Sequence, residues 1–202
     1  MKIFCIGRNY ADHAAELNNP LPAKPMVFMK PSTALLLDNK PFYHPEFSKD
    51  IHYELELVLK VKKNGKHVLP EFAADYFDEV AMGIDFTARD LQEQCKQNGH
   101  PWEIAKSFDH SAAVSNFFPL SDYNRNNISF TLKLNGEKRQ QGQTKNLIFP
   151  FNDLICYISQ YFTLQKGDLI YTGTPAGVGK VAIGDHLEGY LEDKKILECR
   201  IK

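Results

Sequence analysis

The sequence predicts an α+β fold that is mainly β, and two observations lead to this class. Short segments rich in branched and aromatic apolar residues recur along the chain, with turn residues between them. The few segments with helical spacing do not alternate with these strands, as helices would in a doubly wound parallel sheet. We see no linker, repeat or low-complexity tract in the 202 residues. The chain therefore fits one domain spanning residues 1–202, large enough for a substantial core.

Most of the expected elements are short strands. They cover residues 3–6, 27–29, 51–61, 80–87, 128–134, 137–143, 169–172, 186–191 and 196–201. Asn135-Gly136 joins two of them as a hairpin, because this dipeptide tolerates the backbone conformation of tight turns. Helices are expected over residues 10–17, 71–77 and 89–97. Asn152 is expected to cap a fourth helix, in which apolar residues recur three and four positions apart.

Composition and charge limit the classes of partner. Hydrophobic residues make up 43% of the chain, charged residues 24%, and the formal net charge is -1, which gives no basic surface for nucleic acid. No apolar run approaches the length of a membrane span, and the first residues predict a strand rather than a signal peptide. The scattered cysteines predict reduced thiols, at Cys5, Cys95, Cys156 and Cys199. We therefore expect a cytoplasmic protein that binds neither nucleic acid nor membranes.

Two carboxylates within an apolar strand are the strongest sign of chemistry. Glu54 and Glu56 are two residues apart, so their side chains share one face of the expected strand. A half-buried pair of like charges is costly unless a cation neutralises it. Asp85, in a second apolar segment, is the expected third ligand. Hard divalent ions prefer such oxygen ligands, which favours Mg²⁺ before Ca²⁺ or Mn²⁺. A solvated strand face is the alternative explanation.

Three further residues are candidates for acid–base and charge-stabilising roles. His13 and Glu16 lie three apart on a short predicted helix, where Glu16 can orient His13 and raise its pKa. The same spacing also fits a surface ion pair. Lys106 occurs in an apolar neighbourhood, where a lysine either extends to solvent or turns inward to meet an anion.

Two more features follow the strands that carry the carboxylates. Arg89 and Gln92 share a helix face close to Asp85, so they can reach a ligand carboxylate beside a metal at that residue. Residues 172–179 form a glycine-rich segment that follows a strand and carries hydroxyl groups. This segment lacks the lysine-serine ending of a P-loop, which argues against nucleotide binding. It better fits a tight turn that lets the backbone approach a small ligand.

Several motifs, taken in order, resemble those of the fumarylacetoacetate hydrolase family along nearly the whole chain. They are Gly7-Arg8-Asn9-Tyr10-Ala11-Asp12-His13 with Glu16, Lys30-Pro31-Ser32, Glu54-Leu55-Glu56-Leu57, Asp85-Phe86-Thr87-Ala88-Arg89-Asp90-Leu91-Gln92, Ala105-Lys106-Ser107-Phe108, Asn135-Gly136-Glu137 and Thr172-Gly173-Thr174-Pro175-Ala176-Gly177-Val178-Gly179. The chain is most similar to the small single-domain acylpyruvase and oxaloacetate decarboxylase branch. One departure is residues 109–113, where relatives often carry a proline, and this leaves the substrate open.

The resemblance implies a fold, an assembly and a set of site residues. It implies a mixed β-sandwich roll with a few short helices, a homodimer, and Mg²⁺ or Mn²⁺ as the metal. The residues that match the family's motifs are, as metal ligands, Glu54, Glu56 and Asp85; as catalytic residues, His13, Glu16 and Lys106; and as contacts of the substrate's carboxylate end, Arg89, Gln92 and Thr174. The helix with His13 and Glu16 is similar to the family's mobile lid.

The expected reaction is metal-dependent cleavage of a carbon–carbon bond in a small 2-oxo acid, through a pyruvate enolate. An acylpyruvate would be hydrolysed, whereas oxaloacetate would lose CO₂. The alternative is an isomerase, tautomerase or decarboxylase that acts on oxaloacetate or on catechol-pathway dioic acids. A metal-binding or ligand-binding domain without catalysis is the hypothesis from another functional class. Loss of catalysis would not require a retained acid–base group, so the presence of His13 and Glu16 favours an enzyme.

Overall fold

Three β-sheets form the body of the protein in the computed structural model, which describes residues 1–16 and 20–202. The largest sheet has the order β2-β1-β12-β5-β6-β8-β3, with β9 paired to β6. Its strands are β1 (Ile3–Gly7), β2 (Met26–Lys30), β3 (Leu35–Leu36), β5 (Leu55–Val61), β6 (Phe77–Asp85), β8 (Ala112–Val114), β9 (Phe118–Pro119) and β12 (Leu169–Tyr171). Two of its pairings, β1 with β12 and β3 with β8, are parallel and the others are antiparallel. The expected mixed, mainly β fold is therefore confirmed.

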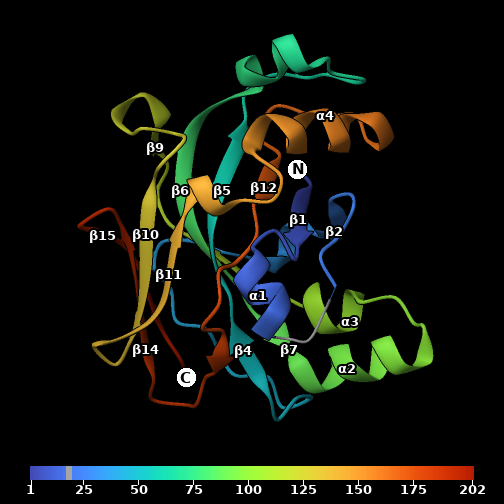
Figure 1. The fold of residues 1–202 in the computed structure, drawn as a ribbon. Coiled ribbons are helices and arrows are strands. Elements are labelled where there is room, and N and C mark those ends of the chain that lie inside the picture. Colours follow the sequence, from blue (N-terminus) through green and yellow to red (C-terminus); the bar gives the residue numbers. More distant parts are fainter. Residues whose placement is uncertain (17–19) are drawn as a thin grey trace.

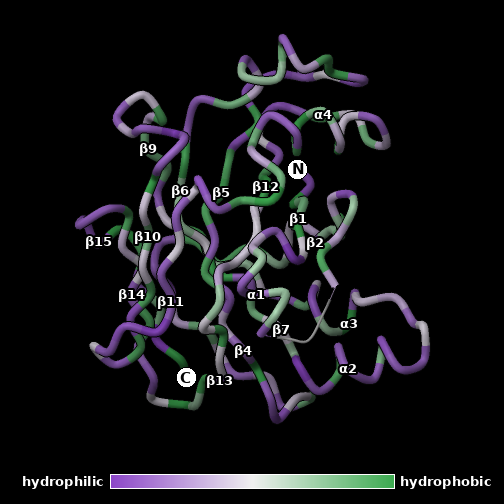
Figure 2. Tube along the Cα trace, in the orientation of Figure 1, coloured by the Kyte–Doolittle hydropathy of each residue, from purple (hydrophilic) through white to green (hydrophobic). Residues whose placement is uncertain are grey.

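A second, four-stranded sheet packs against the first (Figure 1). Its strands, in the order β11-β10-β14-β15, are β10 (Ser129–Leu134), β11 (Glu137–Gln143), β14 (His186–Leu191) and β15 (Lys194–Arg200). The predicted hairpin joins β10 to β11, and both Asn135 and Gly136 have positive φ angles, as the tight turn requires. Alternate residues of β10, including Phe130 and Leu132, are buried in the core shared with the large sheet. In Figure 2 the apolar colour is concentrated on strands in the interior.

The helices lie on the outside of the large sheet (Figure 1). They are α1 (Ala11–Glu16), α2 (Arg89–Asn98), α3 (Glu103–Lys106) and α4 (Phe151–Tyr161). Helix α2 ends at Gly99, whose positive φ allows the left-handed C-cap. In α4 the expected apolar residues Leu154, Ile155 and Ile158 are buried, whereas Tyr161 is exposed. The prediction that Asn152 caps this helix was wrong. Asn152 lies inside the helix and Pro150 is the N-cap, because the fixed backbone angle of proline suits a helix start. The predicted end of α1 at Leu17 lies outside the described residues.

The expected long strand over residues 51–61 is interrupted, and this interruption shapes the site. Strand β4 (Ile51–Tyr53) belongs to a small sheet with β7 (Thr87–Ala88) and β13 (Gly179–Lys180), whereas β5 belongs to the large sheet. Glu54 stands at the junction, where its carbonyl oxygen accepts the Asp85 N–H at 2.8 Å. Apolar patterning does not reveal this change of sheet, because both halves of the segment are buried. Four short 3₁₀ segments complete the structure: Ser32–Ala34, Pro70–Tyr76, Leu120–Asp122 and Thr144–Asn146. The second replaces the helix expected over residues 71–77.

Candidate functional site

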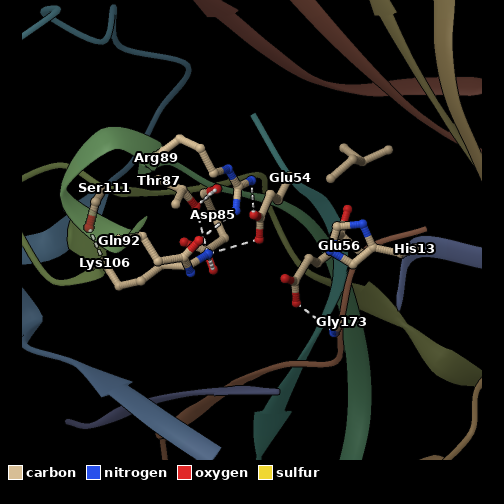
Figure 3. A network of polar contacts seen from close by, with 12 residues as sticks. His13, Glu54, Glu56, Asp85, Thr87, Arg89, Gln92, Lys106, Ser111 and Gly173 are labelled. Atoms are coloured by element: carbon tan, nitrogen blue, oxygen red, sulfur yellow. Dashed lines mark hydrogen bonds and ion pairs between the residues drawn. The ribbon is translucent and has the colours of Figure 1, made fainter. Parts of the chain in front are cut away.

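Three carboxylates converge beside a small cavity of about 30 Å³ (Figure 3). Glu54 and Glu56 flank the start of β5, and Asp85 ends the neighbouring strand β6, so the antiparallel pairing brings the three together. All are buried, and each offers an oxygen within 4.8 Å of the others. The alternative of a solvated strand face is therefore excluded.

Two cationic side chains donate hydrogen bonds to the Glu54 carboxylate and favour its ionised form. Its Oε2 accepts a hydrogen bond from Lys106 Nζ at 2.8 Å, and its Oε1 accepts one from Arg89 Nη2 at 2.6 Å. Burial alone raises the pKa of this carboxyl, but the positive charges of Lys106 and Arg89 outweigh burial and hold the pKa well below its ordinary value. Glu54 is therefore a permanent anion of the site.

Glu56 has the opposite electrostatic environment, although it is only two residues away. Burial, together with the negative charges of Asp85 and Glu54, raises its pKa well above the ordinary carboxyl value. Its Oε2 accepts the Gly173 N–H at 2.6 Å. Gly173 has φ +107°, and a Cβ there would come within 2.6 Å of the Asn9 side chain. The glycine-rich segment thus brings backbone to the carboxylate cluster; its approach to a small ligand, which the sequence suggests, stays a prediction.

Asp85 lies between two buried lysines. Lys106 Nζ donates to Asp85 Oδ2 at 2.8 Å, to Glu54 and to the Thr87 hydroxyl, so its three hydrogens are all used. Lys30 Nζ is 2.8 Å from Asp85 Oδ1, but its hydrogens go to the Lys106 carbonyl and to Ser111. Asp85 Oδ1 is accordingly a buried oxygen without a hydrogen bond. The sequence left open whether Lys106 extends to solvent or turns inward to meet an anion, and the structure shows that it turns inward.

The donor set fits a hard divalent metal ion. The cluster contains carboxylate oxygens and no sulfur or nitrogen ligand, which is the preference of Mg²⁺ and Mn²⁺. Asp85 Oδ1 is buried and accepts no hydrogen bond, although Lys30 Nζ lies 2.8 Å away, and Glu54 and Glu56 each offer a carboxylate oxygen within 4.8 Å of it. The three carboxylates can therefore hold a metal.

Arg89 and Gln92 extend one wall of the cavity from the first turn of α2. Arg89 Nη1 donates to Gln92 Oε1 at 2.7 Å, while its Nη2 binds Glu54. The prediction that Arg89 and Gln92 share a helix face is therefore confirmed. The same face contacts Glu54 through Arg89. Because both terminal nitrogens of the Arg89 guanidinium are hydrogen-bonded, the orientation of this group beside Glu54 is fixed.

His13 and Glu16 approach the cavity from α1. His13 is 4% exposed and lines the cavity, and its Nδ1 lies 3.2 Å from Glu16 Oε2. Glu16 also accepts the Gly177 N–H at 3.0 Å through its other oxygen. If the Nδ1 hydrogen faces Glu16, the Nε2 of a neutral imidazole is the free acceptor. The pair is therefore more than a surface ion pair, because its histidine is enclosed.

Thr174 lines the same cavity and is buried. All nine predicted site residues thus gather around one cavity, Glu16 through its bond to His13. Reasoning from the sequence did not identify several other residues that line or support the site: Arg8, Lys30, Lys96, Trp102 and Gln140. Lys30 and Arg8 belong to recognised motifs, which was an available signal. Gln140 gave none, because a glutamine on a polar hairpin strand is expected to face solvent.

Comparison with known proteins decides the family. A model of the fumarylacetoacetate (FAA) hydrolase C-terminal domain matches residues 2–202. The chain belongs to the fumarylacetoacetate hydrolase family. It is 43% identical over 187 residues to the oxaloacetate tautomerase FAHD1, mitochondrial, of Bos taurus, covering 92% of this chain and 85% of that protein. The Arabidopsis thaliana protein of the same name is 41% identical over 206 residues, covering 100% of this chain and 92% of the relative.

Solved structures of family members share the fold over the full chain. A fumarylpyruvate hydrolase from Pseudomonas aeruginosa, in complex with Mn²⁺ and pyruvate, has a TM-score of 0.94 and 35% identity, covering 100% of this chain and 89% of its own. The 5-carboxymethyl-2-hydroxymuconate delta-isomerase of Mycobacterium smegmatis has a TM-score of 0.87 and 31% identity, covering 99% and 78%. Family members thus include tautomerases, hydrolases and isomerases. Within the described residues, no helix combines the length and apolarity needed to cross a membrane.

Proposed function

We propose that this protein is a Mg²⁺- or Mn²⁺-dependent enzyme that interconverts the keto and enol forms of oxaloacetate. The observation that carries the proposal is the buried cluster of Glu54, Glu56 and Asp85 facing His13 across one cavity. Relatives named oxaloacetate tautomerase, 41–43% identical over most of the chain, support the substrate. Hydrolysis of an acylpyruvate at the bond between C3 and C4 is the second candidate, supported by the likeness to a fumarylpyruvate hydrolase.

The metal site is proposed to consist of Glu54, Glu56 and Asp85, each through a carboxylate oxygen. The bound ion would supply Lewis-acid polarisation of the substrate's 2-oxo group. Lys106 and Arg89 hold Glu54 in place and lower its pKa, and Lys106 and Lys30 hold Asp85 in place, since each positive group contacts one of these carboxylates. Because all three Lys106 hydrogens are engaged, a direct role for Lys106 in stabilising an enolate requires that it release one of these bonds.

His13 is proposed as the general acid–base group. In tautomerisation its Nε2 takes a proton from C3, and a proton delivered to the 2-oxo oxygen by the imidazolium or by water completes the enol. In the reverse direction the enol oxygen loses its proton and Nε2 returns one to C3. In acylpyruvate hydrolysis the same nitrogen takes a proton from the water that attacks C4; the bond between C3 and C4 then breaks, and the imidazolium returns the proton to C3 of the leaving pyruvate enolate. Glu16 orients the ring through Nδ1 and stabilises the imidazolium that forms. One histidine in one place therefore serves both candidate reactions.

Arg89, Gln92 and Thr174 are proposed to bind the carboxylate end of the substrate, because all three line the cavity beside the carboxylate cluster. We also propose that the protein is a homodimer, as the sequence resemblance implies. Sedimentation velocity of the purified protein tests this assembly directly.

Parallel assays of the wild-type protein separate the candidate reactions. The ultraviolet absorbance of enol oxaloacetate is followed with Mg²⁺, with Mn²⁺ and with EDTA, while pyruvate release is measured from oxaloacetate and from acetylpyruvate. Metal-dependent loss of enol absorbance without pyruvate supports tautomerisation. Metal-dependent pyruvate from acetylpyruvate supports the hydrolase, and pyruvate from oxaloacetate alone supports decarboxylation. Rates equal to the protein-free blank in every assay would overturn the proposed function.

A further inference from the structure

Gln140 is a buried polar residue on an otherwise exposed stretch of β11. It is 1% exposed, whereas its neighbours Arg139 and Gln141 face solvent. Its side chain reaches across the interface between the two large sheets to the start of β5 and to the glycine-rich segment. A buried amide needs partners for its oxygen and both of its hydrogens, so the identity of these partners matters.

Both hydrogens and the oxygen of the Gln140 amide are hydrogen-bonded. Its Oε1 accepts the Leu55 N–H at 2.9 Å, between the two glutamates of the carboxylate cluster. Its Nε2 donates to the Pro175 carbonyl oxygen and to Thr174 Oγ1, both at 2.8 Å. Since a backbone N–H can only donate and a carbonyl oxygen can only accept, the orientation of the amide is determined without ambiguity.

This orientation constrains the hydroxyl hydrogen of Thr174. The hydroxyl oxygen already accepts from Gln140, and Nε2 offers no lone pair, so the hydroxyl cannot donate back to Gln140. Within the described residues, no other acceptor is hydrogen-bonded to Thr174 Oγ1. Thr174 is among the residues that line the cavity with Glu54 and Glu56, and its hydroxyl hydrogen has no acceptor in the described part of the chain.

The glycine-rich segment is held against β11 at the same place. A Cβ on Gly177 would come within 2.1 Å of the Arg139 carbonyl oxygen and 3.3 Å of Gln140 Cγ, so the segment packs directly on the strand. Gly177 also has φ +97°, in the region that favours glycine. Gln140 is therefore the polar link between two backbone segments that border the cavity.

We infer that Gln140 is a positioning residue that presents the Thr174 hydroxyl as a hydrogen-bond donor to an anionic oxygen of the substrate. It acts through Thr174 and does not touch the substrate itself. The inference rests on the proposed function, because it takes a 2-oxo acid as the ligand of this cavity. A carboxylate or enolate oxygen is the acceptor that such a buried donor favours.

The test uses pyruvate as the probe, with Mn²⁺ bound to the protein. Gln140→Glu keeps an acceptor for the Leu55 N–H but removes both amide donors, so the Thr174 hydroxyl turns toward the new carboxylate. We expect pyruvate affinity, measured by calorimetry in saturating Mn²⁺, to fall at least about tenfold. Mn²⁺ affinity, measured by electron paramagnetic resonance, should stay within about twofold if the carboxylate cluster is intact.

Two controls separate positioning from general damage. Gln141→Glu adds the same charge to the same strand on its exposed side and should bind pyruvate like the wild type. In a Thr174→Val background, Gln140→Glu should weaken pyruvate binding by less than about threefold, because the hydroxyl it acts on is gone. Gln140→Met, which frees the hydroxyl without adding charge, serves if Gln140→Glu does not fold, and should weaken binding several-fold.

Three results would overturn the inference. Wild-type pyruvate affinity in Gln140→Glu would show that the hydroxyl does not need Gln140. Parallel losses of pyruvate and Mn²⁺ affinity would assign Gln140 a purely structural role in the carboxylate cluster. Full additivity with Thr174→Val would show that the two residues act independently. Wild-type protein that binds Mn²⁺ but no pyruvate would instead contradict the proposed function, and this inference with it.

Discussion

The two sides of the cavity are held in very different ways. On one side, Glu54, Asp85 and Lys106 are buried among strands and α3, and multiple charged contacts lock them together. On the other, His13 is carried by α1, a helix of six residues that is too short to be stable alone. Glu16 is partly exposed there and reaches the rest of the site through one backbone N–H, that of Gly177. Under the proposed function, metal binding and acid–base catalysis are therefore expected to be separable, and the substitutions below test that separation.

Glu56→Gln should have the largest effect, because it removes one carboxylate of the cluster and leaves His13 and α1 unchanged. We expect loss of the metal-induced rise in melting temperature and loss of metal-dependent activity, because an amide cannot replace the charge of the carboxylate. Calorimetric titration with Mn²⁺ measures the affinity, and Glu79→Gln, at a half-buried glutamate of β6 outside the cavity, is the control. Wild-type Mn²⁺ affinity in Glu56→Gln would contradict the proposed ligand set.

The same substitution should change how the stability of the metal-free protein depends on pH. The raised pKa of Glu56 means that its ionisation costs stability as pH rises from the ordinary carboxyl range through the raised value. The wild type should therefore lose stability across that window without metal, and Glu56→Gln should lose less. Urea unfolding in EDTA over a series of pH values checks this sign.

His13→Ala should lower turnover by about 10²–10⁴-fold while leaving metal affinity unchanged, since removing a general acid–base group costs this much. Steady-state rates with oxaloacetate and calorimetry with Mn²⁺ measure the two properties on the same preparation. His67→Ala, at an exposed histidine outside the cavity, is the control. An active His13→Ala protein would remove His13 from the mechanism and leave the metal site standing.

Lys106→Met should destabilise the metal-free protein by about 3–5 kcal/mol, because it leaves two buried carboxylates without their shared partner. The pKa of Lys106 is raised: burial lowers it, but Asp85 and Glu54 together raise it by more. Denaturant unfolding gives the loss, with the exposed Lys63→Met as control. A loss no greater than that of the control would show that the carboxylate side does not depend on this lysine.

Glu16→Ala should have the smallest effect, which sharpens the contrast with Lys106. Its ion pair with His13 is partly exposed, so the loss of stability should be below about 1 kcal/mol. Turnover should fall about tenfold, because the imidazole loses its orienting partner but remains in the cavity. Unfolding and kinetics on one preparation measure both. A loss of stability as large as that of Lys106→Met would mean that the contacts of α1 contribute as much to the free energy of unfolding as those of the carboxylate cluster.

The sequence by itself determined the fold class and the hairpin at Asn135-Gly136, and it named the candidate site residues that the structure gathers around one cavity. These depend on local patterns, such as apolar alternation, turn chemistry and the family motifs, which the chain carries whatever its tertiary contacts. Burial of Glu54, Glu56 and Asp85 was predictable for the same reason, since all three occur within apolar segments.

Only the tertiary structure decided how the charges are paired and which backbone groups serve the site. Glu54 and Glu56 have the same residue type two positions apart, yet their pKa values move in opposite directions. Lys106 and Arg89, which are distant in sequence, contact Glu54 and lower its pKa, whereas burial and the negative charge of Asp85 raise the pKa of Glu56. The break between β4 and β5 and the inward side chain of Gln140 likewise depend on partners that are brought together only by folding. Electrostatic and hydrogen-bond energies depend on distance and burial, and spacing along the chain specifies neither.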